Sequence, residues 1–258
     1  MIENPYPKEW QDLQDGVCRI LNEIGISAVT NYKYQTPRGE VEIDVFGIDQ
    51  KSVERIQYII ECKNWEKSIP QHVVHSFTTV MHETGGNIGF IISKHGLQNG
   101  AREYLKHTNI YGMSFAEFQN RYLSAWWSKQ FCPKVSAAVD TLLQYVEPIN
   151  SRRERFYEKL SDSDKFIFNG LKEKYQSFAT CMAFMNYEQL MPELFLKDKE
   201  PFSPPQNIEF FRENIRSALG PEFDFKSTYY RDLISEISEH LDHVTLQFNK
   251  LFNSDIFA

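Results

Sequence analysis

The sequence has no long hydrophobic run. No stretch approaches the ~18–20 consecutive apolar residues that a membrane-spanning helix requires, and the first residues, Met1–Pro5, lack the basic region and apolar core of a secretory signal peptide. The composition of the 258 residues, 41% hydrophobic and 24% charged, is typical of a globular protein with one large domain or two small ones. We therefore expect a cytoplasmic protein that does not associate with membranes.

Cysteine is scarce and widely spaced. The four cysteines, Cys18, Cys62, Cys132 and Cys181, form no C-x-x-C pair. This spacing argues against a structural zinc site and against a disulfide framework, and it favours small buried hydrophobic side chains. The chain also has no Walker A motif or other Gly-rich loop for phosphate binding, so an ATP-driven step would need a partner protein.

Positive charge is not in excess either. The formal net charge is −7 at neutral pH, which argues against a uniformly basic surface of the kind that coats nucleic acid. If the protein binds nucleic acid, it needs a local basic face or metal ions that offset its own carboxylates.

The first part of the chain alternates between helical and strand patterns. Hydrophobic periodicity predicts the order α-β-β-β-α-β-α-β. Two of the strands bracket a helix, as in a βαβ crossover, which favours a mixed sheet covered by helices. The expected elements are a helix over Trp10–Ile24, strands over Ala28–Tyr34, Val41–Val45 and Ile56–Cys62, a helix over Pro70–Thr84, a strand over Ile88–Ser93, a helix over Leu97–His107 and a strand over Asn109–Phe115.

Strand patterns disappear after about Glu117, and helical spacing takes their place. We therefore expect an α/β domain over residues 1–120 and an all-α helical bundle over residues 121–258. The bundle would serve targeting, regulation or oligomerisation. The expected helices are Arg121–Val146, Ser163–Met185, Asn207–Leu219 and Thr228–Phe252, with a Pro-rich stretch, Pro192–Pro205, between the second and the third.

The last of these helices carries a heptad pattern of apolar residues. Its members are Tyr230, Ile234, Ile237, Leu241, Val244, Phe248 and Leu251. Such a seam is typical both of a helix packed inside its own bundle and of self-association through a coiled coil. A homodimer or larger oligomer that forms through residues 228–252 is the second of these two interpretations.

Two neighbouring predicted strands carry a set of charged residues at their ends. Asp44 lies late in one strand, and Glu61, Cys62 and Lys63 close the next. Carboxylate oxygens and water are the ligands that Mg²⁺ prefers, and such an ion can activate a water beside a phosphodiester. Asp44 and Glu61 would supply side-chain oxygens and Cys62 its backbone carbonyl.

Lys63 is two residues from Glu61, so both side chains lie on the same face of the strand. There Lys63 could orient the water or stabilise negative charge. Glu42 could assist or could belong to the solvated face of an edge strand, as could Glu40. The simpler alternative for the whole set is a surface ion pair at a strand end.

The surrounding motifs resemble a known family. The segments L-Q-D-G-V-C-R-I-L-N-E-I-G (13–25), G-E-V-E-I-D-V-F-G (39–47), I-I-E-C-K-N-W (59–65) and N-I-G-F-I-I-S-K-H-G-L-Q-N-G-A-R-E-Y (87–104) resemble the PD-(D/E)xK nuclease superfamily, and within it the Mrr-like (type IV) restriction endonuclease catalytic domain. The resemblance covers about residues 8–116.

This resemblance implies a restriction-endonuclease-like fold, Asp44 and Glu61 as metal ligands, and Lys63 as the catalytic lysine. It also implies cleavage of DNA with Mg²⁺ as cofactor, with Mn²⁺ as a substitute. Relatives often carry a glutamate in the first helix that reaches the active site, where this chain has Gln14. Since glutamine is a poorer metal ligand, this departure puts a two-metal arrangement in doubt.

Other residues are candidates for accessory roles. Ser93, Lys94, Gln98, Asn99 and Arg102 lie around the start of the helix expected over Leu97–His107 and could contact phosphate; a solvated helix start is the alternative. The pairs His72/His75 and His240/His243 have a spacing that suits metal chelation, but ordinary histidines are favoured because no third ligand follows. Trp126–Trp127 could stack on bases but suits a core better, and the run Arg152–Arg155 could touch a nucleic-acid backbone or form a solvated helix start.

The sequence thus predicts a metal-dependent endonuclease that hydrolyses DNA phosphodiester bonds, with restriction or anti-phage defence as the setting that the resemblance implies. Its partners would be DNA, a second copy of the chain and a protein of the same defence system. Two alternatives stay open: a nuclease-fold module that binds nucleic acid or is silent until a partner activates it, and a nuclease acting on RNA or branched DNA.

Overall fold

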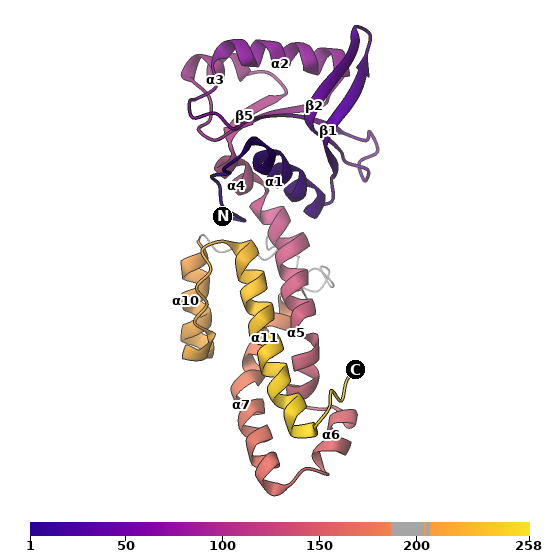
Figure 1. Cartoon of the computed structure of the whole chain (residues 1–258), viewed down its shortest axis with the longest axis vertical. Helices are drawn as coiled ribbons and strands as arrows, with labels where there is room; N and C mark the ends of the chain where they lie inside the picture. Colours follow the sequence, from indigo (N-terminus) through magenta and orange to yellow (C-terminus); the bar gives the residue numbers. More distant parts are fainter. Residues whose placement is uncertain (187–203, 205–206) are drawn as a thin grey trace, which may run out of the picture. The chain divides into compact units, whose positions relative to one another are not determined.

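The computed structural model describes residues 1–186, 204 and 207–258 and divides into two compact units, Met1–Lys129 and Gln130–Ala258 (Figure 1). Most of the Pro-rich stretch expected over Pro192–Pro205 lies outside the described residues. None of the described helices is long and apolar enough to cross a membrane.

The first unit is built on a five-stranded sheet in the order β1-β2-β3-β4-β5. β1 pairs antiparallel with β2 and β2 with β3, whereas β3 and β4, and β4 and β5, are parallel. The predicted mixed sheet and the predicted order of elements are therefore confirmed. The strands are β1 Ser27–Thr36, β2 Gly39–Ile48, β3 Gln57–Lys63, β4 Ile88–Ser93 and β5 Ile110–Ser114.

Helices cover both faces of this sheet. α2 (Gln71–Thr84) and α3 (Asn99–Leu105) lie on one face, and α1 (Trp10–Glu23) and α4 (Phe115–Trp126) lie on the other (Figure 1). α2 ends where predicted, because Gly85 adopts a left-handed conformation with φ 66° that side chains with a Cβ rarely take. The crossover β3-α2-β4 sets the parallel part of the sheet.

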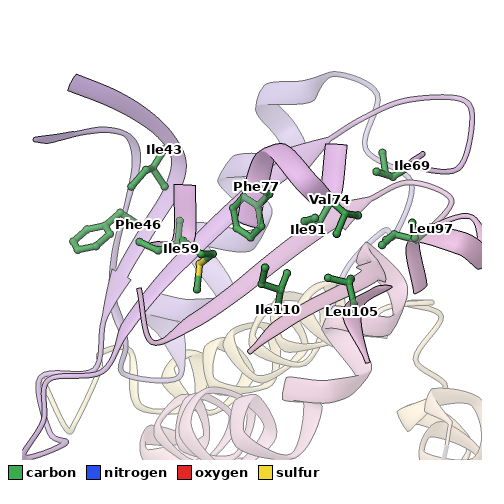
Figure 2. Packing of buried hydrophobic residues seen from close by; sticks show 12 residues of the cluster. Ile43, Phe46, Ile59, Ile69, Val74, Phe77, Ile91, Leu97, Leu105 and Ile110 are labelled. Carbon is green, nitrogen blue, oxygen red and sulfur yellow. The ribbon is translucent and has the colours of Figure 1, made fainter. Parts of the chain in front are cut away.

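The core on the α2 and α3 side joins sheet and helices (Figure 2). Ile59 of β3 and Ile91 of β4 face Phe77 of α2 in this cluster, and all three side chains are almost fully buried. Burial of apolar side chains of this size stabilises the fold by about 1.5–3 kcal/mol each. The ends of β2 and β3 that carry the charged residues are therefore anchored to a rigid core.

Strict alternation along β2 breaks at Asp44. Ile43 and Phe46 both belong to the cluster on the α2 side, although they are three residues apart. Val45 pairs with Ile60, and neither belongs to that cluster. The partner strand shows the cause, because Asn31 has φ 51° and neither it nor Asp44 takes part in the ladder between Thr30↔Val45 and Tyr32↔Ile43. The strand expected over Val41–Val45 is therefore confirmed within β2, but Val45 does not join Val41 and Ile43 at the same core cluster, as a single period of two would require.

The second unit is helical, as predicted. α5 (Cys132–Val146), α7 (Asp162–Phe184) and α11 (Tyr230–Phe252) pack on one another (Figure 1). The structure also contains the short helix α6 (Ser151–Tyr157), α10 (Ile208–Leu219) and the 3₁₀ turn Pro221–Phe223. The single helix expected over Arg121–Val146 is instead α4, a π-helix over Trp127–Phe131 and α5.

The expectation of a solvated basic run fails at Arg153, which is completely buried. Its guanidinium donates to the carbonyl oxygens of Tyr145 and Glu147 and pairs with Glu154. These carbonyls belong to the last turn of α5 and the residue after it, where helices leave acceptors without partners. Arg153 therefore serves to end α5 rather than to meet a nucleic acid.

The heptad seam of α11 packs inside its own unit. Tyr230, Ile237, Leu241, Val244 and Phe248 are buried there, whereas Ile234 and Leu251 are half-buried. Phe248 stacks on Tyr145 of α5 with ring centroids 4.9 Å apart and meets Phe168 of α7 edge-to-face at 5.4 Å. The seam is thus occupied by intramolecular contacts.

Candidate active site

Asp44 lies where the pairing of β2 with β3 ends. The last paired residues are Val45 and Ile60, so Asp44 and Glu61 are the next two to face each other across the strands. The Oδ2 atom of Asp44 accepts a hydrogen bond of 2.7 Å from the backbone N–H of Cys62. This bond takes the place of the backbone hydrogen bonds between β2 and β3, which end at Val45, and it holds the Asp44 carboxylate against β3.

Glu61 and Lys63 close β3 on the same face. Their side chains form an ion pair, and about a quarter of each is exposed, 26% for Glu61 and 24% for Lys63. Cys62 between them points the other way and is buried. The structure thus brings Asp44, Glu61 and Lys63 together in a partly exposed site, as the sequence predicts.

Burial and mutual charge set the protonation of the three groups. Burial raises the pKa of the Glu61 carboxyl, an effect that Lys63 opposes and Asp44 strengthens. Burial acts to lower the pKa of the Lys63 ammonium, but its bond to Glu61 and the charge of Asp44 outweigh burial, so this pKa is raised. Lys63 is therefore a firmly protonated cation at neutral pH.

The accessory candidates occupy different environments. Gln14 is buried on α1, with 4% of its surface exposed. Glu42 is exposed on β2. Glu40 is held by Lys33 at 3.1 Å and by Gln35 at 3.0 Å, so it belongs to the solvated surface of the β1–β2 hairpin.

The residues proposed for phosphate contact lie around the β4–α3 connection. Ser93 is adjacent to Lys63 in the parallel register, but it is buried and its hydroxyl donates to the Gly96 carbonyl oxygen at 3.0 Å. Lys94 pairs with Glu66 at 2.6 Å, and Arg102 donates to the Leu97 carbonyl oxygen at 3.1 Å. Gln98 and Asn99 are exposed at the start of α3. Three of the five side chains thus hold the loop together.

The histidine pairs and the tryptophan pair form no further site. Among the described residues, no group of three or more His, Cys, Asp or Glu side chains is arranged to hold a metal ion. Trp126 and Trp127 are fully buried, as expected of core residues.

Sequence reasoning missed a contact beside the site. The side-chain amide of Asn64, the residue after Lys63, donates to the backbone carbonyl oxygens of Pro7 and Lys8 at 3.5 and 3.2 Å. It ties the segment before α1 to the end of β3. Backbone carbonyls carry no sequence signal, and only the Asn itself in I-I-E-C-K-N-W could have drawn attention to this position.

The donor set suits a hard divalent cation. Two carboxylates from adjoining strands, each with solvent access, match the way proteins hold Mg²⁺, with one or two carboxylates and the remaining ligands from water and substrate phosphate. A closed zinc site would need four protein ligands, commonly Cys or His. Asp44 and Glu61 therefore fit an open magnesium-type site.

A comparison with protein-family models agrees with this geometry. Residues 8–121, under half of the chain, match a family model described as restriction endonuclease, of the Mrr catalytic type. A solved structure titled a protein of unknown function, AF1548, is similar over 97% of this chain and 99% of its own, with 15% identity and a TM-score of 0.35. A search of curated proteins finds no match. Residues 8–121 of the chain are therefore a catalytic domain of the Mrr-like restriction endonuclease family, a nuclease domain with the PD-(D/E)xK arrangement.

Proposed function

We propose that the chain is a metal-dependent endonuclease that hydrolyses phosphodiester bonds in DNA. Asp44 and Glu61 would hold Mg²⁺, or Mn²⁺ in its place, together with the backbone carbonyl of Cys62. The observation that carries the proposal is the hydrogen bond from Cys62 to Asp44, because it holds the two carboxylates on facing strands beside Lys63. The family match over residues 8–121 supports the same reaction.

A bound divalent ion would neutralise the phosphate and make a coordinated water easier to deprotonate. Lys63 acts as a cation, because its raised pKa keeps it protonated. When Glu61 gives an oxygen to an ion, the ammonium can turn toward a phosphate oxygen and stabilise the negative charge that develops there. Glu42 and Gln14 would assist only by orienting water at the edge of the site.

The setting follows from the family. We propose a role in restriction or anti-phage defence inside the cytoplasm, with the helical part, residues 121–258, in targeting, regulation or assembly. A homodimer is expected because cutting both strands needs two sites. Since the heptad seam is occupied inside its own unit, a dimer would use another surface, or α11 would have to exchange partners. A protein of the same defence system is a further proposed partner.

One observation favours a second candidate, a module that is silent until a partner activates it. The carboxylate of Glu61 is engaged by Lys63, and the helix position that often supplies a glutamate holds the buried Gln14. A site closed in this way would bind nucleic acid without cutting it. A partner that draws Lys63 away from Glu61 would open the site.

Cleavage of supercoiled plasmid tests the proposal. Wild type should nick or linearise both methylated and unmethylated plasmid, or one of them, in Mg²⁺ or Mn²⁺ and not in EDTA. Lys63→Ala should abolish cleavage. Lys106→Ala is the matched control, because Lys106 is 62% exposed and pairs with Glu103 on the surface, and it should cut like wild type.

The two candidates give different results. If folded wild type binds DNA but cuts no plasmid in either metal, the endonuclease proposal fails and the partner-activated module replaces it. If Lys63→Ala cuts as well as wild type, the assignment of the site to Lys63 is wrong.

A further inference from the structure

Three large aromatic side chains are exposed near the end of β3. Tyr6 is 60% exposed, Trp10 52% and Trp65 43%. The other two tryptophans of the chain, Trp126 and Trp127, are completely buried. Exposing large indole surfaces costs free energy that burial would recover, so a group of them marks a surface that binds something. We call Tyr6, Trp10 and Trp65 the aromatic patch.

Hydrogen bonds bring the members of the aromatic patch to one place. Trp65 follows Lys63 by two residues. Asn64 donates to the carbonyl oxygens of Pro7 and Lys8, two of the three residues between Tyr6 and the start of α1. The segment that carries Tyr6 and Trp10 is thus fastened to the same end of β3 as the ion pair of Glu61 and Lys63.

Cations are interleaved with these rings. Lys8 lies between Tyr6 and Trp10, and Lys67 lies two residues after Trp65; both are exposed, as is Glu9, which forms the capping box of α1 with Asp12. The nearby carboxylate of Glu66 is neutralised by Lys94, which holds it at 2.6 Å. Surfaces that bind single-stranded nucleic acid combine aromatic side chains, on which bases stack, with basic side chains that contact the phosphate backbone.

We propose that the aromatic patch is a subsite for an unpaired stretch of DNA strand, which it holds beside the active site by stacking of bases. A base inside a duplex presents only its edge in the grooves, because its faces are covered by its neighbours. Exposed indole and phenol faces can be used by bases only where the strand is unpaired, as in single-stranded, forked or gapped DNA. The proposal rests on the proposed nuclease function and names the substrate class of that same site.

Binding through base stacking is compatible with the acidic balance of the chain. With a net charge of −7, long-range attraction to a duplex is weak, whereas stacking is sequence-tolerant and needs few lysines. A second copy of the chain is the other partner that could bind the exposed rings. Binding of a second copy needs complementary apolar surfaces and gives no reason for lysines beside the rings, so Lys8 and Lys67 favour nucleic acid.

Equilibrium binding in EDTA separates binding from cleavage. We would titrate the full chain with a single-stranded oligonucleotide, the same sequence as a blunt duplex, and a fork that joins both. The single strand and the fork should bind at least about ten-fold more tightly than the duplex. Trp65→Ala and Trp10→Ala should each weaken binding of the single strand by roughly 5- to 100-fold, the range expected for loss of one stacked base.

Tryptophan fluorescence identifies the contact directly. Because Trp126 and Trp127 are buried, quenching by a bound oligonucleotide should come from Trp10 and Trp65. Trp65→Phe should keep most of the affinity, since an aromatic face remains, and should lose part of the quenching. Phe166→Ala is the control, because Phe166 is 82% exposed on α7 and should leave both affinity and quenching unchanged.

The outcomes are distinct from those for the nuclease itself. Equal affinity for single strand and duplex, or unchanged binding by Trp10→Ala and Trp65→Ala, would overturn the subsite while leaving plasmid cleavage as evidence for the nuclease. Strand-selective binding by a protein that never cuts would support the subsite and contradict the nuclease. A change in the sedimentation mass of Trp65→Ala without a change in oligonucleotide binding would assign the patch to a second copy instead.

Discussion

At the residue scale, Asp44 combines two roles that substitution can separate. Its Oδ2 atom accepts the Cys62 N–H, and its charge would serve a metal ion. Asp44→Asn keeps an acceptor oxygen but removes the charge, so we expect a normally folded protein without metal-dependent cleavage. Asp44→Ala removes both and leaves a backbone donor unpaired, which should lower the free energy of unfolding by about 1–3 kcal/mol. Denaturant unfolding and plasmid cleavage measure the two effects.

Glu42 provides the matched comparison for Asp44. It is an exposed acid on the same strand, two residues earlier, and Glu42→Gln should change neither stability nor cleavage substantially. Loss of cleavage in Glu42→Gln comparable with that in Asp44→Asn would show that Glu42 belongs to the metal centre. Equal stability of the Asn and Ala variants at position 44 would show that the hydrogen bond to Cys62 contributes little.

The residues of the candidate site could be predicted from sequence because their information is local. Glu61 and Lys63 share a strand, and a spacing of two places them on one face. The aromatic patch could not be predicted, since it depends on the amide of Asn64 meeting carbonyls more than fifty residues away along the chain. The engagement of Glu61 by Lys63 also needed three-dimensional structure.

At the scale of elements, hydrophobic periodicity gave the correct order because each strand and helix buries one continuous apolar face. It failed where backbone conformation overrides alternation. Asn31 has a positive φ and does not pair with Asp44 opposite it, although β1 continues through this position. Asp44 accepts a hydrogen bond from β3 instead. It also failed at Arg153, because sequence alone predicts that an arginine is exposed. The carbonyl oxygens at the end of α5 that accept its hydrogen bonds are known only from the structure.

The α11 helix offers a test of how its heptad seam is used. Leu241 lies in the seam and is 1% exposed, whereas Leu246 on the same helix is 55% exposed. Leu241→Ala should lower the free energy of unfolding by about 2–5 kcal/mol, and Leu246→Ala by less than ~0.5 kcal/mol. Thermal denaturation gives the stabilities and sedimentation gives the mass. A Leu241→Ala protein that stays fully stable but loses an oligomeric form would instead place the seam between copies of the chain.

At the scale of the whole molecule, the two units have different roles. The first unit places the carboxylates of Asp44 and Glu61 and the Lys63 ammonium together where the pairing of β2 with β3 ends. The described part of the second unit packs four aromatic side chains, Tyr175, Phe178, Phe223 and Phe225, as a box around His240. The stability of the protein at acidic pH should therefore depend on the helical unit, which contains His240. Binding of metal and nucleic acid should depend on the sheet.

His240 makes that expectation specific. Its Nε2 atom has no hydrogen-bond partner among the residues that the structure describes, and burial, followed by the charge of His243, lowers its pKa. Lys174 acts in the same direction, while Glu222 and Glu236 oppose it. Above pH ~6.5 the imidazole is neutral in both folded and unfolded chains. Below that pH the unfolded chain takes up the proton more readily, so the contribution of His240 to stability is lost as pH falls toward its folded pKa.

Replacing the imidazole should therefore remove part of the acid sensitivity. We expect the melting temperature of wild type to fall between pH 7 and 5 more steeply than that of His240→Phe, which fills the aromatic box without a titrating group. His243→Gln, a change at an exposed position outside the box, should keep most of the wild-type slope. Melting curves across this pH range decide the matter, because parallel slopes for wild type and His240→Phe would mean that the buried imidazole does not couple protonation to folding.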